Sequence, residues 1–90
     1  MVKKSFTIKN KLGIHARPAG LLVKTASRFK SLAYISNEGD LEVNAKSIMG
    51  VLMLGAAFGS TIHLRIEGED EQEAMKALEE VIINRQFDEE

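Results

Sequence analysis

A histidine, an arginine and the chain's only proline lie close together in the segment Gly13–Ala19, which reads GIHARPA. Pro18 lacks a backbone N–H and has a fixed φ that suits a first helical turn, so the segment predicts a helix that begins just after His15. The free amides and positive dipole of a helix start attract anions, and the Arg17 guanidinium can donate to two oxygens at once. The sequence therefore predicts a phosphate-binding helix start with the imidazole of His15 directly before it.

The imidazole of His15 has two possible roles at this position. A positive helix start disfavours the charged form of the ring, so more of the ring would be neutral and nucleophilic. A ring nitrogen can accept a phosphoryl group, and phosphoryl transfer asks a protein mainly for positioning and charge stabilisation. A histidine before a helix is also often a polar surface residue or a cap, and the local sequence leaves both interpretations open.

The second histidine, His63, provides an internal control. It stands on the polar side of an alternating segment, 60–67, away from any predicted helix start, and we expect it to be a solvated surface residue. The two histidines lack cysteine or carboxylate partners at the spacing of metal ligands, so we expect no metal site and no cofactor. The absence of cysteine also excludes disulfides.

Length and composition limit the class of protein. A chain of 90 residues with 44% apolar and 28% charged residues is typical of one globular domain, here spanning residues 1–90. A formal net charge of -1 argues against a nonspecific nucleic-acid binder. The first residues lack the apolar run of a signal peptide, and no segment is long enough to insert in a membrane, so we expect a cytoplasmic protein.

Hydrophobic periodicity predicts the element order β-α-β-β-α-β-α. Strands are expected at 2–9, 32–36, 41–44 and 60–67, and helices at 16–29, at 47–55 and from Asp70 onward, where Asp70 and Glu73 resemble a capping pair. The last helix should bury Ala74, Leu78, Val81 and Ile82, and the end of the chain, 87–90, should be loose. The fold class is then α/β (α+β), a two-layer sandwich with a four-stranded antiparallel sheet and three helices on one face.

Two predicted helices present surfaces that suit a partner. The first should bury Ala19, Leu22, Val23, Ala26 and Phe29, and should expose a basic stripe of Arg17, Leu21, Lys24 and Arg28. If the second turns Val51 and Leu54 inward, its outward side chains are Ile48, Met49 and Leu52. A small apolar centre with a charged rim suits fast binding and release, although these residues could also be ordinary solvated or covered helix faces.

Two motifs and the element order together resemble the HPr family of histidine-containing phosphocarriers, which includes NPr, in the bacterial phosphoenolpyruvate-dependent phosphotransferase system. The motifs are Gly13–Ala19 and Lys46–Val51, which reads KSIMGV. The resemblance implies an open-faced β-sandwich in which Nδ1 of His15 accepts a phosphoryl group from phosphorylated enzyme I and donates it to an enzyme IIA domain, with Arg17 assisting. It also implies a monomeric carrier, a cosubstrate of other enzymes rather than an enzyme itself.

The same resemblance implies that an HPr kinase/phosphorylase modifies Ser47. A phosphate at a helix start is locally favourable, and its charge beside Ile48, Met49 and Leu52 would weaken the docking of an acidic partner. Ser47 could also be only a helix cap. The segment 51–54 and the ending 87–90 are closer to the nitrogen-related NPr branch, so the sequence leaves open whether a sugar or a nitrogen pathway is served. A regulatory binding module that acts only through Ser47 is the alternative function.

Overall fold

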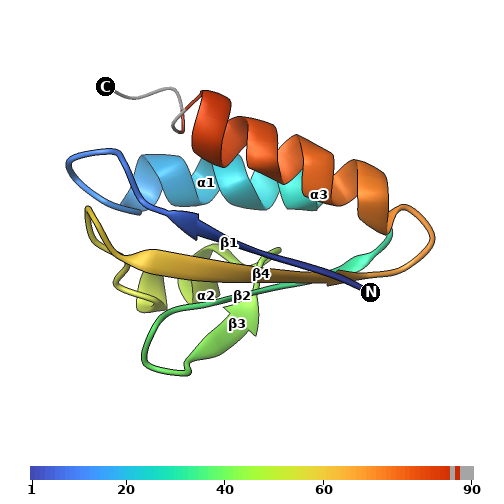
Figure 1. The fold of residues 1–90 in the computed structure, drawn as a ribbon, viewed down its shortest axis with the longest axis horizontal. Coiled ribbons are helices and arrows are strands. Elements are labelled where there is room, and N and C mark those ends of the chain that lie inside the picture. The colour runs from blue at the N-terminus through green and yellow to red at the C-terminus, as the bar shows by residue number, and fades with distance from the viewer. Residues whose placement is uncertain (86, 88–90) are drawn as a thin grey trace.

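The computed structural model describes residues 1–85 and 87, and it confirms the predicted element order (Figure 1). The elements are β1 (Val2–Thr7), α1 (Ala16–Ala26), β2 (Leu32–Ser36), β3 (Glu42–Asn44), α2 (Ile48–Met53), β4 (Thr61–Glu67), α3 (Glu71–Glu79) and a π-helical turn, η1 (Glu80–Asn84). Within these described residues, no helix combines the length and the apolar character that crossing a membrane requires.

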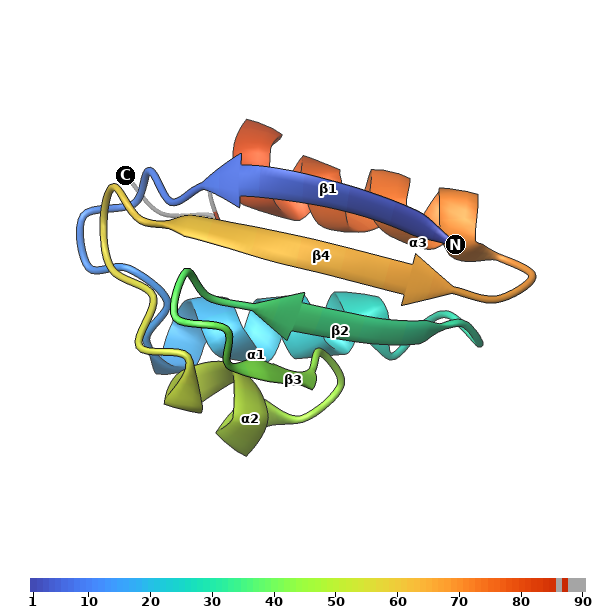
Figure 2. The same cartoon turned by 60° about the horizontal axis from the view of Figure 1, so that its bottom comes forward.

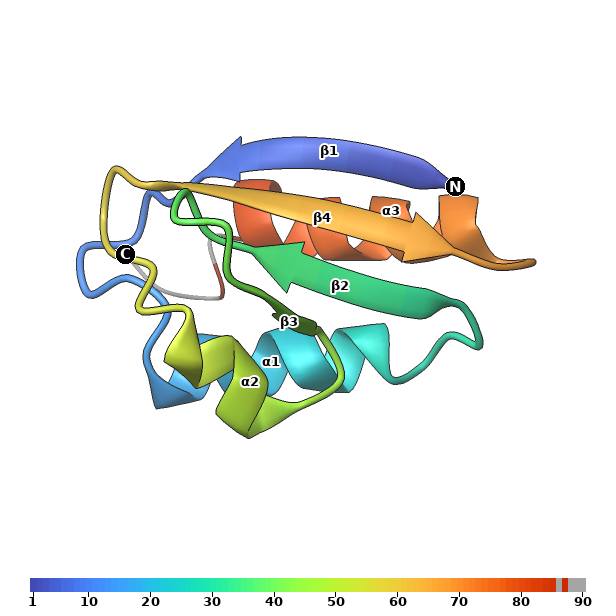
Figure 3. The ribbon, with the colours of Figure 1, turned by 90° about the horizontal axis from the view of Figure 1, so that it is seen from below.

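The four strands form one antiparallel sheet in the order β1-β4-β2-β3. Alternation in β4 buries Ile62, Leu64 and Ile66 on the side of the helices and turns His63 and Glu67 to the opposite side. Figures 2 and 3 show α1 and α3 behind the sheet, while α2 packs against α1 and β3. The predicted two-layer architecture with one open sheet face is therefore confirmed.

The first helix ends at Ala26, three residues earlier than its apolar pattern predicts. The amides of Arg28 and Phe29 turn back to the carbonyls of Thr25 and Ala26, both at 3.2 Å, and these tighter bonds close the helix. Phe29 still packs against the core from beyond the helix end. Gly20 lies inside α1, where an added methyl group would contact nothing within 4 Å, and nothing in the structure explains the glycine.

The second helix corrects one prediction about its outward face. Ile48 and Met49 are exposed as expected, but Leu52 is half-buried and packs against the core, and Met53 is 66% exposed instead. At 3.6 residues per turn, Leu52 and Met53 both lie about 130° around the helix axis from the mean direction of the inward residues Val51 and Leu54. Periodicity cannot choose between the two flanks of so short a helix, and only its tertiary packing decides which flank is covered.

The end of the chain also differs from the prediction. Phe87 is 1% exposed and packs in the core with φ +58°, so the expectation of a loose tail is wrong for this residue. Residues 88–90 of that expected tail lie outside the described part of the chain. The last helix buries Ala74, Leu78, Val81 and Ile82 as predicted, and it closes with a π-type bond from the Arg85 amide to the Glu80 carbonyl.

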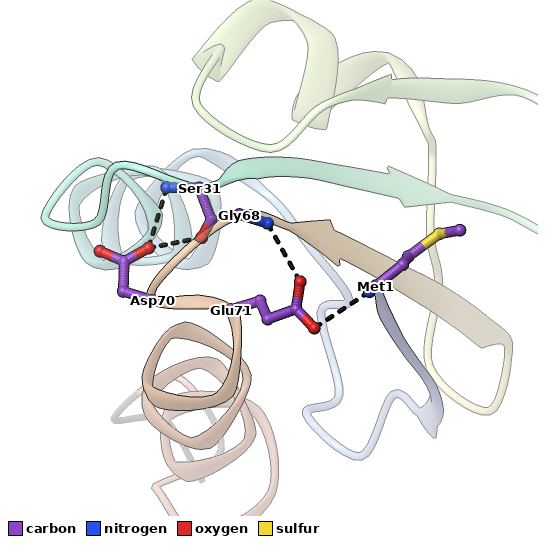
Figure 4. Close-up of polar contacts among 5 residues, drawn as sticks. All are labelled: Met1, Ser31, Gly68, Asp70 and Glu71. Carbon is purple, nitrogen blue, oxygen red and sulfur yellow. Dashed lines mark hydrogen bonds and ion pairs between the residues drawn. The ribbon is translucent and has the colours of Figure 1, made fainter.

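Asp70 and Glu71 tie the start of α3 to its surroundings, in place of the predicted Asp70–Glu73 capping pair (Figure 4). The Asp70 carboxylate accepts hydrogen bonds from the Ser31 hydroxyl and from the amides of Lys30 and Ser31, both at 2.9 Å. These donors, the Ser31 hydroxyl first, lower the pKa of Asp70 from an ordinary 3.8 to about 2. Glu71 instead accepts from the Gly68 amide at 3.1 Å and lies 3.0 Å from the Met1 amino group.

Candidate functional site

His15 is the N-cap of α1, with the extended backbone that a cap requires (φ -92°, ψ -167°). Its carbonyl accepts the first helical bond from the Ala19 amide at 3.0 Å, and Pro18 is buried in the first turn. The His15 side chain makes no capping hydrogen bond to the helix. The amides of Ala16 and Arg17 belong to the first turn, which has no intrahelical acceptors, so they can serve an anion held beside His15.

The loop before His15 is fixed by hydrogen bonds. Asn10 is 1% exposed, and its Nδ2 donates to the Gly13 carbonyl at 2.5 Å while the Gly13 amide donates to the Asn10 carbonyl at 3.0 Å. The Ile14 amide donates at 2.9 Å to the carbonyl of Ala56, which follows α2. These bonds hold the backbone on the N-terminal side of His15, and the sequence interpretation, which treated 10–13 as a plain loop, missed the role of Asn10.

Gly13 allows this loop to approach the segment after α2. Its φ is +68°, in the region that favours glycine, and a Cβ atom there would collide with the Ala56 carbonyl oxygen. The loop that carries His15 and the loop after α2 are also joined by the Gly59 amide, which donates to the Ile8 carbonyl at 2.8 Å. The position of His15 therefore depends on two loops that are far apart in the sequence.

The ring of His15 is partly exposed, but one of its nitrogens is not. Nε2 is shielded from solvent, so a phosphoryl donor could reach that atom only after the ring moved.

The basic stripe is only partly available to a partner. Arg17 and Lys24 are exposed, and neither forms an ion pair within residues 1–85 and 87. Arg28 is also exposed, but its guanidinium lies 5.6 Å from the ring centre of Phe29, which gives it a packing role as well. Leu21 is half-buried and packs against the core. The structure thus favours Arg17 and Lys24 as the cations that a partner meets first.

Exposed apolar side chains lie on the two loops beside His15 and on α2, which packs against α1. Leu12, on the loop before His15, is 76% exposed, and Phe58, on the loop bonded to it, is 63% exposed. Met49 and Met53 of α2 are 70% and 66% exposed. We call these four residues, together with Ile48, the apolar rim. The sequence interpretation missed Leu12, Met53 and Phe58, although Leu12 and Phe58 are large apolar residues that each precede a glycine in a loop, which was a usable signal.

Ser47 is the N-cap of α2, and its Oγ accepts a hydrogen bond from the Gly50 amide at 3.1 Å. The neighbouring Lys46 donates through Nζ to the Phe29 carbonyl at 2.8 Å, beyond the C-terminal end of α1. The bond from Lys46 to Phe29 places the start of α2 near the C-terminal end of α1, whereas His15 lies at the beginning of α1. Figure 3 shows the two helices running in opposite directions. The two sites therefore lie toward different ends of α1, which is about 16 Å long over its eleven residues.

The remaining candidate groups lie elsewhere. His63 is exposed on the open sheet face, as expected, and its Nδ1 lies 2.7 Å from the Ser5 hydroxyl. The described part of the chain contains no cluster of three or more histidine, cysteine or carboxylate side chains that could hold a metal ion.

Comparisons with known proteins agree with this geometry. A family model described as "PTS HPr component phosphorylation site" matches residues 2–84. The chain is 52% identical over 85 residues to the phosphocarrier protein HPr of Xylella fastidiosa, covering 94% of each chain. It is 54% identical over 78 residues to the HPr-like protein Crh of Halalkalibacterium halodurans, covering 87% of this chain and 92% of Crh. A crystal structure of HPr from Thermoanaerobacter tengcongensis superposes with a TM-score of 0.91 at 48% identity, covering 100% and 99% of the two chains.

Proposed function

The chain belongs to the HPr family of phosphocarriers of the phosphotransferase system, and from this premise we propose that it carries the phosphoryl group on Nδ1 of His15. The observation that supports this assignment best is the position of His15 at the uncapped start of α1, with Nε2 shielded and Arg17 in the same first turn. As a member of this family the chain is a carrier and not an enzyme, so its site has to both accept and release the phosphoryl group.

The transfer itself needs few groups. The lone pair of Nδ1 attacks phosphorus, the bond from phosphorus to the donor atom breaks, and that bonding pair stays with the donor. The phosphoryl oxygens then lie beside the amides of Ala16 and Arg17 and within reach of the Arg17 guanidinium, which can donate to two of them. Exposed interactions of a charge with a helix end contribute about 0.3 to 1 kcal/mol each, which stabilises the group without trapping it.

Docking of the partners completes the proposal. Phosphotransferase partners in general follow from the family, and enzyme I as donor and enzyme IIA domains as acceptors are the specific partners we propose. The apolar rim and the cations Arg17 and Lys24 lie on α1, on α2 and on the two bonded loops beside His15, and we propose that one partner surface contacts both. A small apolar contact with steering charges favours fast association and fast release.

A labelling experiment tests the site. Incubation with phosphoenolpyruvate and enzyme I should give an acid-labile, base-stable phosphate that is lost in His15→Ala and retained in His63→Ala. His63 is the matched control because it is the only other histidine and lies on the open sheet face. Full labelling of His15→Ala would refute the assignment.

Ser47 supplies the proposed regulation, through phosphorylation by an HPr kinase/phosphorylase. The hydroxyl already accepts a bond from the helix amide of Gly50, and a phosphate there would add roughly two negative charges close to Ile48 and Met49. Because Ser47 lies toward the end of α1 and His15 at its beginning, a phosphate on Ser47 would act on docking rather than on the His15 ring.

A regulatory module that acts only through Ser47 is the second candidate function, and the 42% identity to Crh, the catabolite repression HPr of Bacillus subtilis, favours it. The two candidates give different results in one assay. The carrier is labelled by phosphoenolpyruvate with enzyme I, whereas the module is labelled only by ATP with the kinase.

We also propose that the chain works as a cytoplasmic monomer, which sedimentation of the purified protein would test. A relative from Thermoanaerobacter tengcongensis has been solved as an HPr dimer, so a stable dimer at micromolar concentration would overturn the monomeric form.

A further inference from the structure

The open face of the sheet carries a polar cluster around His63 that the carrier chemistry does not use. His63 on β4 is paired in register with Ser5 on β1 and with Ser36 on β2, so hydroxyl side chains flank the imidazole on both sides. Cross-strand neighbours have Cβ atoms about 4.5 to 5.5 Å apart, within reach of one small ligand. The Ser5 hydroxyl already lies 2.7 Å from Nδ1 of His63.

These residues line a shallow hollow of about 430 Å³ whose charge is mainly positive. Lys3, Lys4 and Arg65 contribute to its wall, and Glu42 is the one carboxylate among the residues that line it. Arg65 donates to both Glu42 oxygens, at 2.8 and 3.2 Å, and lies 4.3 Å from the ring centre of Tyr34. The Glu42 charge is therefore already matched on the β3 side of the hollow.

The two lysines at this edge of the sheet differ in availability. The Lys4 ammonium is held 2.5 Å from Glu79 of α3. The Lys3 ammonium makes no ion pair with a carboxylate in the part of the chain that the structure describes, and Lys3 lies on the same face as Ser5, two residues before it. Lys3 is thus the cation that remains for a ligand in the hollow.

The donors that face the hollow match an oxyanion. When the Ser5 hydroxyl donates to Nδ1, the neutral His63 ring carries its proton on Nε2 and offers that N–H as a donor. The Ser36 hydroxyl and the Lys3 ammonium add donors from two other positions. A planar carboxylate offers two oxygens on one side, whereas a phosphate group offers oxygens in several directions and suits donors from separate strands.

We propose that Ser5, His63, Ser36 and Lys3 form a second anion site, which binds the phosphate group of inorganic phosphate or of a phosphate monoester. The hollow is larger than a phosphate group alone, so it has room for part of the organic group of a monoester. The site lies on the uncovered face of the sheet, whereas His15 lies at the start of a helix on the other face. Binding here is reversible and does not depend on transfer through His15.

The test is an NMR titration of the full chain in a His15→Ala background, which removes the imidazole of the first site. Inorganic phosphate should shift the His63 ring signals and the Ser5 and Ser36 amides with saturation, at fixed pH and constant ionic strength. His63→Ala removes a hydrogen bond to the charged ligand and should weaken binding about tenfold. Ser5→Ala removes the donor that keeps the His63 proton on Nε2, and it should also weaken binding. Methyl phosphate that binds more tightly than inorganic phosphate would assign the site to monoesters, and equal or weaker binding would assign it to free phosphate.

Thr7→Ala is the matched control, because Thr7 is an exposed hydroxyl residue on the same strand and face, one pair further along. It should bind phosphate as the background variant does. The proposal fails if the shifts do not saturate, if acetate produces them equally at the same concentration, or if Ser5→Ala and His63→Ala bind phosphate unchanged. All these variants change exposed positions, and far-ultraviolet circular dichroism verifies that each one folds.

Discussion

The starts of α1 and α2 use their cap residues in different ways. At α2, the Ser47 hydroxyl accepts a hydrogen bond from the Gly50 amide, so the side chain completes the helix start. At α1, the His15 side chain makes no such bond, and Pro18 removes an amide that would otherwise need an acceptor. One helix start is satisfied within the chain, while the other keeps donors for a ligand. This contrast supports the proposal that the start of α1 carries a phosphoryl group, while phosphorylation at the start of α2 would regulate docking.

The largest expected effect comes from the loop that positions His15. In Gly13→Ala, the positive φ and the collision with the Ala56 carbonyl should displace the loop and lower the rate of transfer from enzyme I about 10- to 100-fold. The free energy of unfolding should fall by at least about 1 to 2 kcal/mol, the cost of left-handed backbone for an L-residue. Single-turnover labelling and urea unfolding measure the two quantities.

Gly55→Ala is the control for this prediction. Gly55 also has positive φ, at +60°, but an added Cβ would contact nothing within 4 Å. This variant should lose stability through φ alone and keep the transfer rate within about twofold. Equal loss of transfer in both variants would show that the close approach to Ala56 does not position His15.

A smaller effect is expected from charge at the start of α2. Ser47→Asp should slow phosphorylation by enzyme I about fivefold, since one charge close to the docking surface costs about 1 kcal/mol at short range in water. Stopped-flow or quench-flow measurements of the transfer rate would give this number. An unchanged rate would remove the proposed regulation.

For Ser47→Ala we expect the opposite of Ser47→Asp: a change in stability without a change in the transfer rate. Ser47→Ala removes the acceptor for the Gly50 amide and should lower the free energy of unfolding by about 1 kcal/mol while leaving the transfer rate unchanged. Ser47→Asp keeps an acceptor at the cap and should unfold within a few tenths of a kcal/mol of the parent. Thermal unfolding of both variants tests whether cap and regulation are separable functions of one hydroxyl.

The start of α3 adds the smallest effect, visible only in acid. The pKa of Asp70 is lowered from 3.8 to about 2 by the Ser31 hydroxyl and the amides of Lys30 and Ser31. A depressed folded-state pKa stabilises the fold fully above the unfolded value, and this contribution is lost as pH falls through the folded value. Parent stability should therefore decline between about pH 4 and pH 2, and Asp70→Asn should flatten that decline. If the stability of the parent and of Asp70→Asn declined equally between these pH values, other carboxylates would dominate the loss of stability in acid.

Element types and order followed from the sequence because strands and helices here have clear periods. The alternation of 60–67 places Ile62, Leu64 and Ile66 inside, and the helical period buries Ala19 and Leu22, as the structure confirms. The short α2 was harder to assign, since Leu52 and Met53 lie equally far from the inward direction. A short helix offers too few turns for periodicity to define a face.

The residues of the site were only partly predictable. Local sequence was enough to identify three candidate residues, His15, Arg17 and Ser47, from their types and their positions relative to helix starts. Asn10, Leu12 and Phe58 depend on the pairing of two loops that are more than forty residues apart, joined by the bonds from Ile14 to Ala56 and from Gly59 to Ile8. No periodic signal marks such loop pairing.

The sequence by itself determined which chemical groups stand at the helix starts of this protein: an imidazole, a guanidinium and a proline at one, and a hydroxyl at another. These choices depend on residues within one turn of each other, where backbone geometry is fixed by local sterics. Only the tertiary structure decided what surrounds them, including the buried Asn10, the apolar rim and the separation of Ser47 from His15. Those features arise from packing between segments distant in the chain, which no local preference encodes.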